Sequence, residues 1–179
     1  MNLPVAVREA YRGYQPPFYF KATVEKLLAT VPEKYLIGLD CVVLINQSGM
    51  PRRDRVGKIR SRKRQVDKLH VLGRYHPRRG SFSAYIELRV DRIILGLETA
   101  GFPKIKPLRE IGIAHVLFHE VGHHIHATMR PEHLEKEDVA DRWAGKLNRN
   151  FIRNKYWYLL PVMIPAAWIY KFARRHRWT

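Results

Sequence analysis

Residues 115–126 read His-Val-Leu-Phe-His-Glu-Val-Gly-His-His-Ile-His, and the segment His119-Glu120-Val121-Gly122-His123 within them organises the rest of the chain. On an α-helix, residues four positions apart lie on one face, so the two imidazoles can converge on one metal ion. Glu120 projects beside the same position, where a carboxylate can accept a proton from water. This spacing is typical of a zinc hydrolase.

The residues around this motif indicate a buried helix. Residues 111–121 are mostly apolar, and Pro107 stands near the start of the segment, where a helix tolerates proline. Burying a charged Glu120 on such a helix is costly unless the charge has a partner, which favours a metal site. The alternative is a histidine-rich helix whose rings are satisfied by hydrogen bonds.

Length and composition indicate one globular domain. The chain has 179 residues, of which 46% are hydrophobic, and this is enough for a sizeable core. Cys41 is the single cysteine, so no internal disulfide can form, and the first residues lack the basic-then-apolar order of a signal peptide. We therefore expect a cytoplasmic protein.

The net charge of +17 predicts attraction to nucleic acid, anionic lipid or acidic proteins, or else a merely basic, solvated surface. Residues 52–64 concentrate this charge, with eight basic residues and one acidic residue. We expect an exposed loop or hairpin there, either solvated or binding a polyanion through phosphate contacts. The basic residues of this segment are Arg52, Arg53, Arg55, Lys58, Arg60, Arg62, Lys63 and Arg64.

Apolar and alternating runs predict the strands. Residues 36–46 are rich in Leu, Ile and Val and are expected to form a buried strand. Residues 82–90 alternate between apolar and polar side chains, as in a strand with one buried face. Residues 69–75 can pair with that strand across the turn-rich connection 76–80.

The N-terminal half also contains segments expected to be helical or irregular. Residues 1–20 are interpreted as an irregular arm with a short helix over residues 5–11. A helix is expected from about Thr23, ended by Pro32, and a short helix is expected over residues 91–98.

The end of the chain, residues 156–179, joins an apolar stretch to a basic one. Residues 156–170 are uncharged, but they fall short of the roughly 20 residues that a membrane-spanning helix needs. Pro161 and Pro165 also interrupt the stretch. We expect a tail packed across the core or against a partner chain, with peripheral attachment to an anionic membrane as the alternative.

A further helix is expected from about His133 to Asn150. Glu137 and Asp141 lie four residues apart on one face of it, where like charges repel unless a cation or hydrogen-bond donors compensate them. The alternative is two solvated acids on a surface helix. The neighbouring apolar stripe consists of Val139, Ala140, Trp143, Ala144 and Leu147.

The two helical segments together resemble the zinc-binding segments of the ImmA/IrrE-type peptidases, within the gluzincin group. The resemblance rests on His119-Glu120-Val121-Gly122-His123 and Glu137-x-x-Ala140-Asp141-x-Trp143-Ala144-x-x-Leu147. It implies a zincin-like α+β fold with a small mixed or antiparallel sheet, and a peptide or protein substrate. It also implies one zinc ion per chain held by His119, His123 and Glu137, with Glu120 as general base. The family's usual Leu-Leu-Met-Pro ending is absent, and we find no helix-turn-helix partner domain.

Helix geometry also favours Glu137 as the third ligand. His126 lies about 10 Å along the helix axis from His119, too far for all the rings to meet one tetrahedral ion. His133 could reach the ion but is expected in the first turn of its helix, whereas Glu137 lies a full turn deeper. Asp141, one turn further on, is then placed to orient a ligand histidine.

Peptide hydrolysis also needs an oxyanion donor, for which His133, His76, Tyr75 and Tyr85 are candidates. One alternative function is a DNA-associated protease similar to the SprT-like group, which completes its zinc site with a third histidine. Another is a non-catalytic nucleic-acid- or membrane-binding module with a structural zinc. Structural zinc sites usually have four protein ligands, often cysteines, and this chain has one cysteine.

Overall fold

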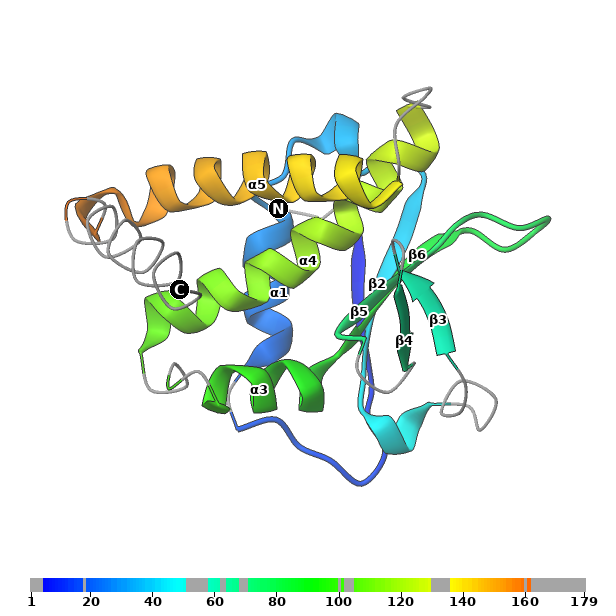
Figure 1. The fold of residues 1–179 in the computed structure, drawn as a ribbon, viewed down its shortest axis with the longest axis horizontal. Coiled ribbons are helices and arrows are strands. Elements are labelled where there is room, and N and C mark those ends of the chain that lie inside the picture. Colours follow the sequence, from blue (N-terminus) through cyan, green and yellow to red (C-terminus); the bar gives the residue numbers. More distant parts are fainter. Residues whose placement is uncertain are drawn as a thin grey trace, which may run out of the picture.

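The chain folds as an α+β protein with a small mixed sheet and helices packed against one face of it (Figure 1). The computed structural model describes residues 5–17, 19–50, 58–61, 64–67, 71–99, 101, 105–129, 136–159 and 161, with the backbone alone for 58–61 and 64–67.

The sheet has the strand order β1-β2-β6-β5. Strands β1 (Ala6–Ala10), β2 (Leu39–Ile45) and β6 (Ala84–Arg89) are parallel, and β5 (Gly73–His76) is antiparallel to β6 at one edge. The predictions of a strand within 36–46, of a strand within 82–90 and of an antiparallel partner preceding the latter are thus confirmed.

Residues 5–11 differ from the prediction. Ala6–Ala10 form strand β1 and no helix, so the arm 1–20 is not irregular throughout. Val5 and Val7 are buried two residues apart, which is the period of a strand. Pairing with β2 supplies hydrogen bonds along the whole segment, whereas a helix this short gains too few to offset the cost of nucleation.

Four helices complete the described part of the fold, and every expected helix except the one over residues 5–11 is present with altered bounds. The helix expected from about Thr23 begins earlier, and the helix expected to end at Asn150 continues for five more residues. The helices are α1 (Phe20–Leu28), α3 (Val90–Thr99), α4 (Lys106–Met129) and α5 (Lys136–Lys155), with short 3-10 turns η1 (Glu33–Tyr35), η2 (Gln47–Gly49) and η4 (Trp157–Leu159).

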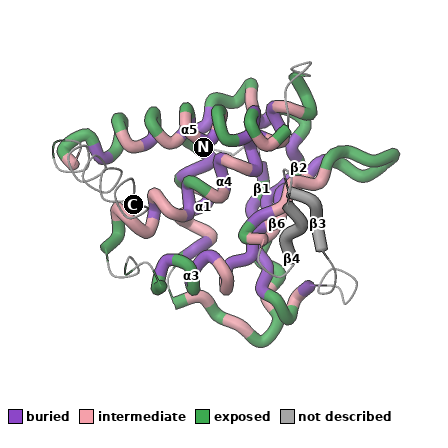
Figure 2. The backbone as a smooth tube through the Cα atoms, viewed as in Figure 1, coloured by how far each residue is buried: buried purple, intermediate pink, exposed green. Residues whose placement is uncertain are grey.

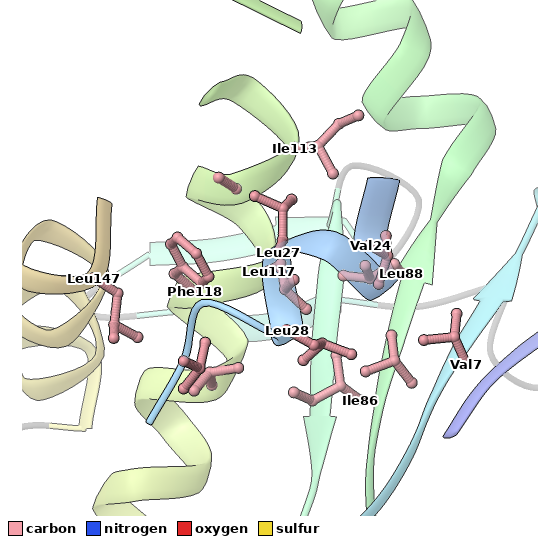
Figure 3. Close-up of a cluster of buried hydrophobic side chains, with 14 of the residues drawn as sticks. Val7, Val24, Leu27, Leu28, Ile86, Leu88, Ile113, Leu117, Phe118 and Leu147 are labelled. Atoms are coloured by element: carbon pink, nitrogen blue, oxygen red, sulfur yellow. The ribbon is translucent and has the colours of Figure 1, made fainter. Parts of the chain in front are cut away.

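The core lies between the sheet and helices α1 and α4 (Figures 2 and 3). Alternation along β6 turns Ile86 and Leu88 toward the helices, as predicted, while Phe82 before the strand is 77% exposed. Helix α4 is central to this core, because it packs against both the sheet and α5. Labelled core residues in Figure 3 include Val24, Leu27, Leu28, Leu117, Phe118 and Leu147.

The basic segment 52–64 is described only in part. Lys58–Ser61 (β3) and Arg64–Asp67 (β4) form an antiparallel hairpin, but the side chains of residues 52–64 lie outside the described residues. The tail beyond residue 161 lies outside them as well. Among the helices that are described, none combines the length and apolar character needed to cross a membrane.

Candidate metal centre

Helix α4 presents His119 and His123 side by side. Its buried stripe of Ile113, Leu117, Val121 and Ile125 faces the core, which turns the two histidines toward α5. Their Nε2 atoms are 3.2 Å apart, and both rings are about one-fifth exposed. The spacing of four residues therefore produces the convergence that the sequence predicted.

Glu137 on α5 joins the two histidines. Its Oε2 lies 3.5 Å from His119 Nε2, and its Oε1 lies 3.8 Å from His123 Nε2. Tetrahedral zinc with bonds of about 2.0–2.1 Å holds its donor atoms about 3.3 Å apart. The three observed separations lie close to that value, so these residues fit one ion of this size and leave a position for a further ligand.

The approach of α5 depends on Gly122, inside the motif. A Cβ atom at Gly122 would lie 2.6 Å from the carbonyl oxygen of Ala140 and 2.7 Å from its Cα. The two helices therefore touch backbone to backbone at this point. Because Ala140 lies three residues after Glu137 and one before Asp141, the same contact brings both carboxylates to the histidines.

Asp141 holds the ring of His119. Its Oδ1 lies 3.0 Å from His119 Nδ1, which is close enough for that ring nitrogen to donate to the carboxylate. This leaves Nε2, the nitrogen that faces Glu137 and His123, free to bind a metal. Asp141 lies next to a candidate ligand histidine, and its role as an orienting residue stays a prediction.

Glu120 is buried next to the three candidate ligands. Its side chain accepts a hydrogen bond from the backbone N–H of Tyr75 on the edge strand β5. Burial raises its pKa to about 8; the Glu137 carboxylate raises it as well, and the Tyr75 N–H lowers it. A Cβ atom at Gly73 would lie 2.8 Å from Glu120 Cγ, so the glycine provides the space that this side chain occupies.

The electrostatic environment keeps His123 neutral. Burial lowers its pKa to about 4, and the neighbouring rings of His119 and His126 lower it as well. A neutral imidazole is the form that binds a metal ion. His123 is therefore ready to bind a cation at neutral pH without first losing a proton.

His124 is a site residue that the sequence analysis did not assign. It is fully buried, its Nε2 lies 3.1 Å from the carbonyl oxygen of Ile37, and its Nδ1 lies 3.2 Å from the Tyr75 hydroxyl. Because a carbonyl only accepts, Nε2 carries the proton and the Tyr75 hydroxyl donates to Nδ1. His124 thus fastens β5 to α4, and this contact fixes the strand that touches Glu120.

The oxyanion candidates fall in different places. The Tyr75 hydroxyl is engaged by His124, as described above. His76 and Tyr85 stack with ring centroids 4.3 Å apart, and strand alternation places them on the sheet face opposite α4. The structure does not bring these two residues to the three ligands. His133 lies outside the described residues.

Among the described residues, His119, His123 and Glu137 form a group whose donor atoms lie within 4.8 Å of one another and could hold a metal ion. No protein-family model matches this chain, and neither the curated proteins nor the solved structures contain a significant match to it.

Proposed function

We propose that this chain is a zinc-dependent metallopeptidase with a zincin-like fold. The observation that carries the proposal is the convergence of His119, His123 and Glu137 from two helices, with Glu120 buried beside them. Two imidazoles and one carboxylate with an open position form the ligand set of a catalytic zinc site. In contrast, a purely structural zinc is usually held by four protein ligands.

In the proposed amide hydrolysis, different residues of the chain have different roles. His119, His123 and Glu137 would hold the zinc ion, which would supply a Lewis acid for the scissile carbonyl and for a water molecule. The charge of a bound cation would lower the pKa of Glu120 from its raised value, and the ionised carboxylate would then accept the proton of that water and deliver it to the leaving amine. Asp141 keeps the His119 ring in the tautomer that leaves Nε2 free, and the Tyr75 N–H holds the Glu120 carboxylate in place.

The position of the Glu137 carboxylate supports a gluzincin type of site rather than an SprT-like one. Both Glu137 oxygens face the histidines, at 3.5 and 3.8 Å. We expect purified protein to hold about one equivalent of zinc, and Glu137→Ala to lower the zinc affinity severely while His133→Ala leaves it nearly intact. Titration calorimetry on the metal-free variants measures this. The reverse result would move the protein toward a site with three histidines.

The catalytic assignment is tested with Glu120→Gln. The amide keeps the size of the side chain but cannot accept a proton, so we expect full zinc content and a loss of peptide hydrolysis of about 100-fold or more. The measurement is cleavage of a quenched fluorescent peptide library by zinc-loaded protein. If the variant cleaves any substrate of the wild type at an equal rate, Glu120 is not the base.

A further inference from the structure

The exposed side of α5 carries a row of basic side chains that the metal centre does not use. They are spaced by four, three and four residues, so they lie on one face of the helix, and all are exposed. In Figure 2 the side of α5 away from α4 is exposed along the helix. We call this row the α5 basic ridge; it consists of Arg142, Lys146, Arg149 and Arg153.

The dimensions of the α5 basic ridge suit a polyanion with regularly spaced charges. At 1.5 Å of rise per residue, the ridge extends about 16 Å from Arg142 to Arg153. Each strand of a nucleic-acid duplex places a phosphate about every 3.4 Å along its axis, so about five phosphates face this length. Four side chains that each reach several ångströms can contact successive phosphates over that distance.

The charge of the ridge is not neutralised within the described part of the chain. No ion pair there joins a ridge residue to an acid: Asp138, exposed four residues before Arg142, forms none, and Asp141 lies 3.0 Å from His119 Nδ1. Lys146 lies 4.6 Å from the centre of the Trp143 ring, and Trp143 packs on Tyr35. Lys34 lies over the other member of that aromatic pair and adds a further positive charge beside the ridge.

The composition of this face favours nucleic acid over a membrane surface. A helix that lies on a bilayer needs an apolar face that is free to enter the membrane, opposite its basic face. On α5 the apolar residues Val139, Leu147 and Phe151 are buried against the protein, and Asn150 is exposed between Arg149 and Arg153. Asparagine and basic side chains are common donors to phosphate oxygens.

We propose that the α5 basic ridge binds the phosphodiester backbone of nucleic acid without reading its sequence. DNA and RNA both have a phosphodiester backbone, so binding is tested with a DNA duplex and with a single-stranded RNA. This inference stands on the exposed face of α5 and does not depend on the proposed peptidase activity.

The test replaces all four ridge residues by glutamine. Arg, Lys and Gln have similar helix propensities, so α5 is retained, and circular dichroism checks this. Fluorescence anisotropy then measures binding to a short labelled duplex and a short labelled RNA between about 50 and 200 mM salt. We expect the slope of log affinity against log salt to flatten by about 3 for the duplex, with at least a tenfold loss of affinity at the lowest salt.

The chain has many other basic residues, so a matched control is needed. It distinguishes an effect of the ridge residues from an effect of the overall net charge. The control changes four other exposed basic residues, Arg12, Lys26, Arg78 and Arg79, to glutamine and so removes the same net charge. It should lose clearly less affinity than the ridge variant. A third variant, with Arg142, Arg149 and Arg153 changed to lysine, keeps every charge and should retain binding.

Several results would overturn the proposal. The first is an equal loss of nucleic-acid affinity in the ridge and control variants. The second is a loss of binding in the lysine variant, and the third is the absence of wild-type binding to either nucleic acid. The wild type is also tested on phosphatidylserine vesicles. If binding to the vesicles requires the ridge residues and binding to nucleic acid does not, the ridge is a membrane-binding surface instead.

Discussion

Gly73 shows how one residue on the edge strand governs the proposed base. It lies on β5 facing Glu120, and a Cβ atom at this position would lie 2.8 Å from Glu120 Cγ and 2.9 Å from its Oε1, inside the space of that side chain. Glu120 cannot simply turn away, because it is buried and holds the Tyr75 N–H. Gly73 therefore contributes to the position of the carboxylate, although it supplies none of the metal ligands.

We expect Gly73→Ala to retain zinc but lose peptide hydrolysis by about 10- to 100-fold, since displacing a catalytic group by about 1 Å has effects of this size. Zinc content and cleavage rate are measured on the same preparation. Gly96→Ala is the control, because Gly96 is exposed on α3 and a Cβ there meets no atom within 4 Å. Full activity in Gly73→Ala would show that the contact with Glu120 has no role in positioning it.

At the scale of elements, the site is a crossing of two helices. Helix α4 supplies His119 and His123, and α5 supplies Glu137, at the point where Gly122 meets the backbone of Ala140. Helix propensity alone disfavours glycine inside a helix by about 1 kcal/mol relative to alanine. The close contact supplies the reason for glycine at this position, because backbone atoms cannot move aside as a flexible side chain can.

We expect Gly122→Ala to force the two helices apart and to destabilise the protein by about 1–3 kcal/mol, the usual range for overpacking. The same displacement moves Glu137 from the histidines, so zinc affinity falls as well. Urea denaturation and zinc titration measure the two effects. Gly145→Ala on α5 is the matched control, since its Cβ would make only an ordinary contact of 3.5 Å with Arg149. Unchanged stability and zinc affinity in Gly122→Ala would contradict the role of this crossing.

At the scale of the whole molecule, a buried carboxylate joins the start of α4 to the end of α5. Glu110 is 5% exposed and accepts hydrogen bonds from Lys155 Nζ and the Tyr156 hydroxyl, each at 2.5 Å. Burial by itself raises the pKa of Glu110, but these two donors and the charge of Lys106 outweigh it and leave the pKa below its ordinary value of 4.5. The carboxylate therefore stabilises the fold in its ionised form.

Glu110→Gln should lower the free energy of unfolding at pH 7 by about 1–3 kcal/mol, as expected for a buried bond to a charged group. Because the folded-state pKa is depressed, this stabilisation is fully present above pH 4.5 and is lost as the pH falls through the folded pKa. The difference between wild type and variant should thus shrink in acid. Urea denaturation from pH 7 downward measures it, with Glu25→Gln as a control in a surface pair with Lys21. A difference that does not change with pH would refute the linkage.

The amino-acid sequence was sufficient to predict the features of this protein that depend on local geometry. The spacing of His119 and His123, and of Glu137 and Asp141, sets which side chains share a helix face, because an α-helix repeats every 3.6 residues. Alternation along residues 84–88 likewise predicted which side of β6 is buried, whereas Arg89 is buried although it falls on the polar side of the pattern. These patterns require no knowledge of distant residues, and the structure agrees with each of them.

The way in which these elements contact one another became visible in the folded protein. Residues 5–11 could be read as a helix until pairing with β2 made them a strand. The contact of Glu120 with Gly73 joins α4 to the edge strand, and the contacts of His124 with Tyr75 and Ile37 join residues 49 and 87 positions apart. Such contacts depend on packing and on hydrogen bonds between elements, for which a single sequence carries no periodic signal.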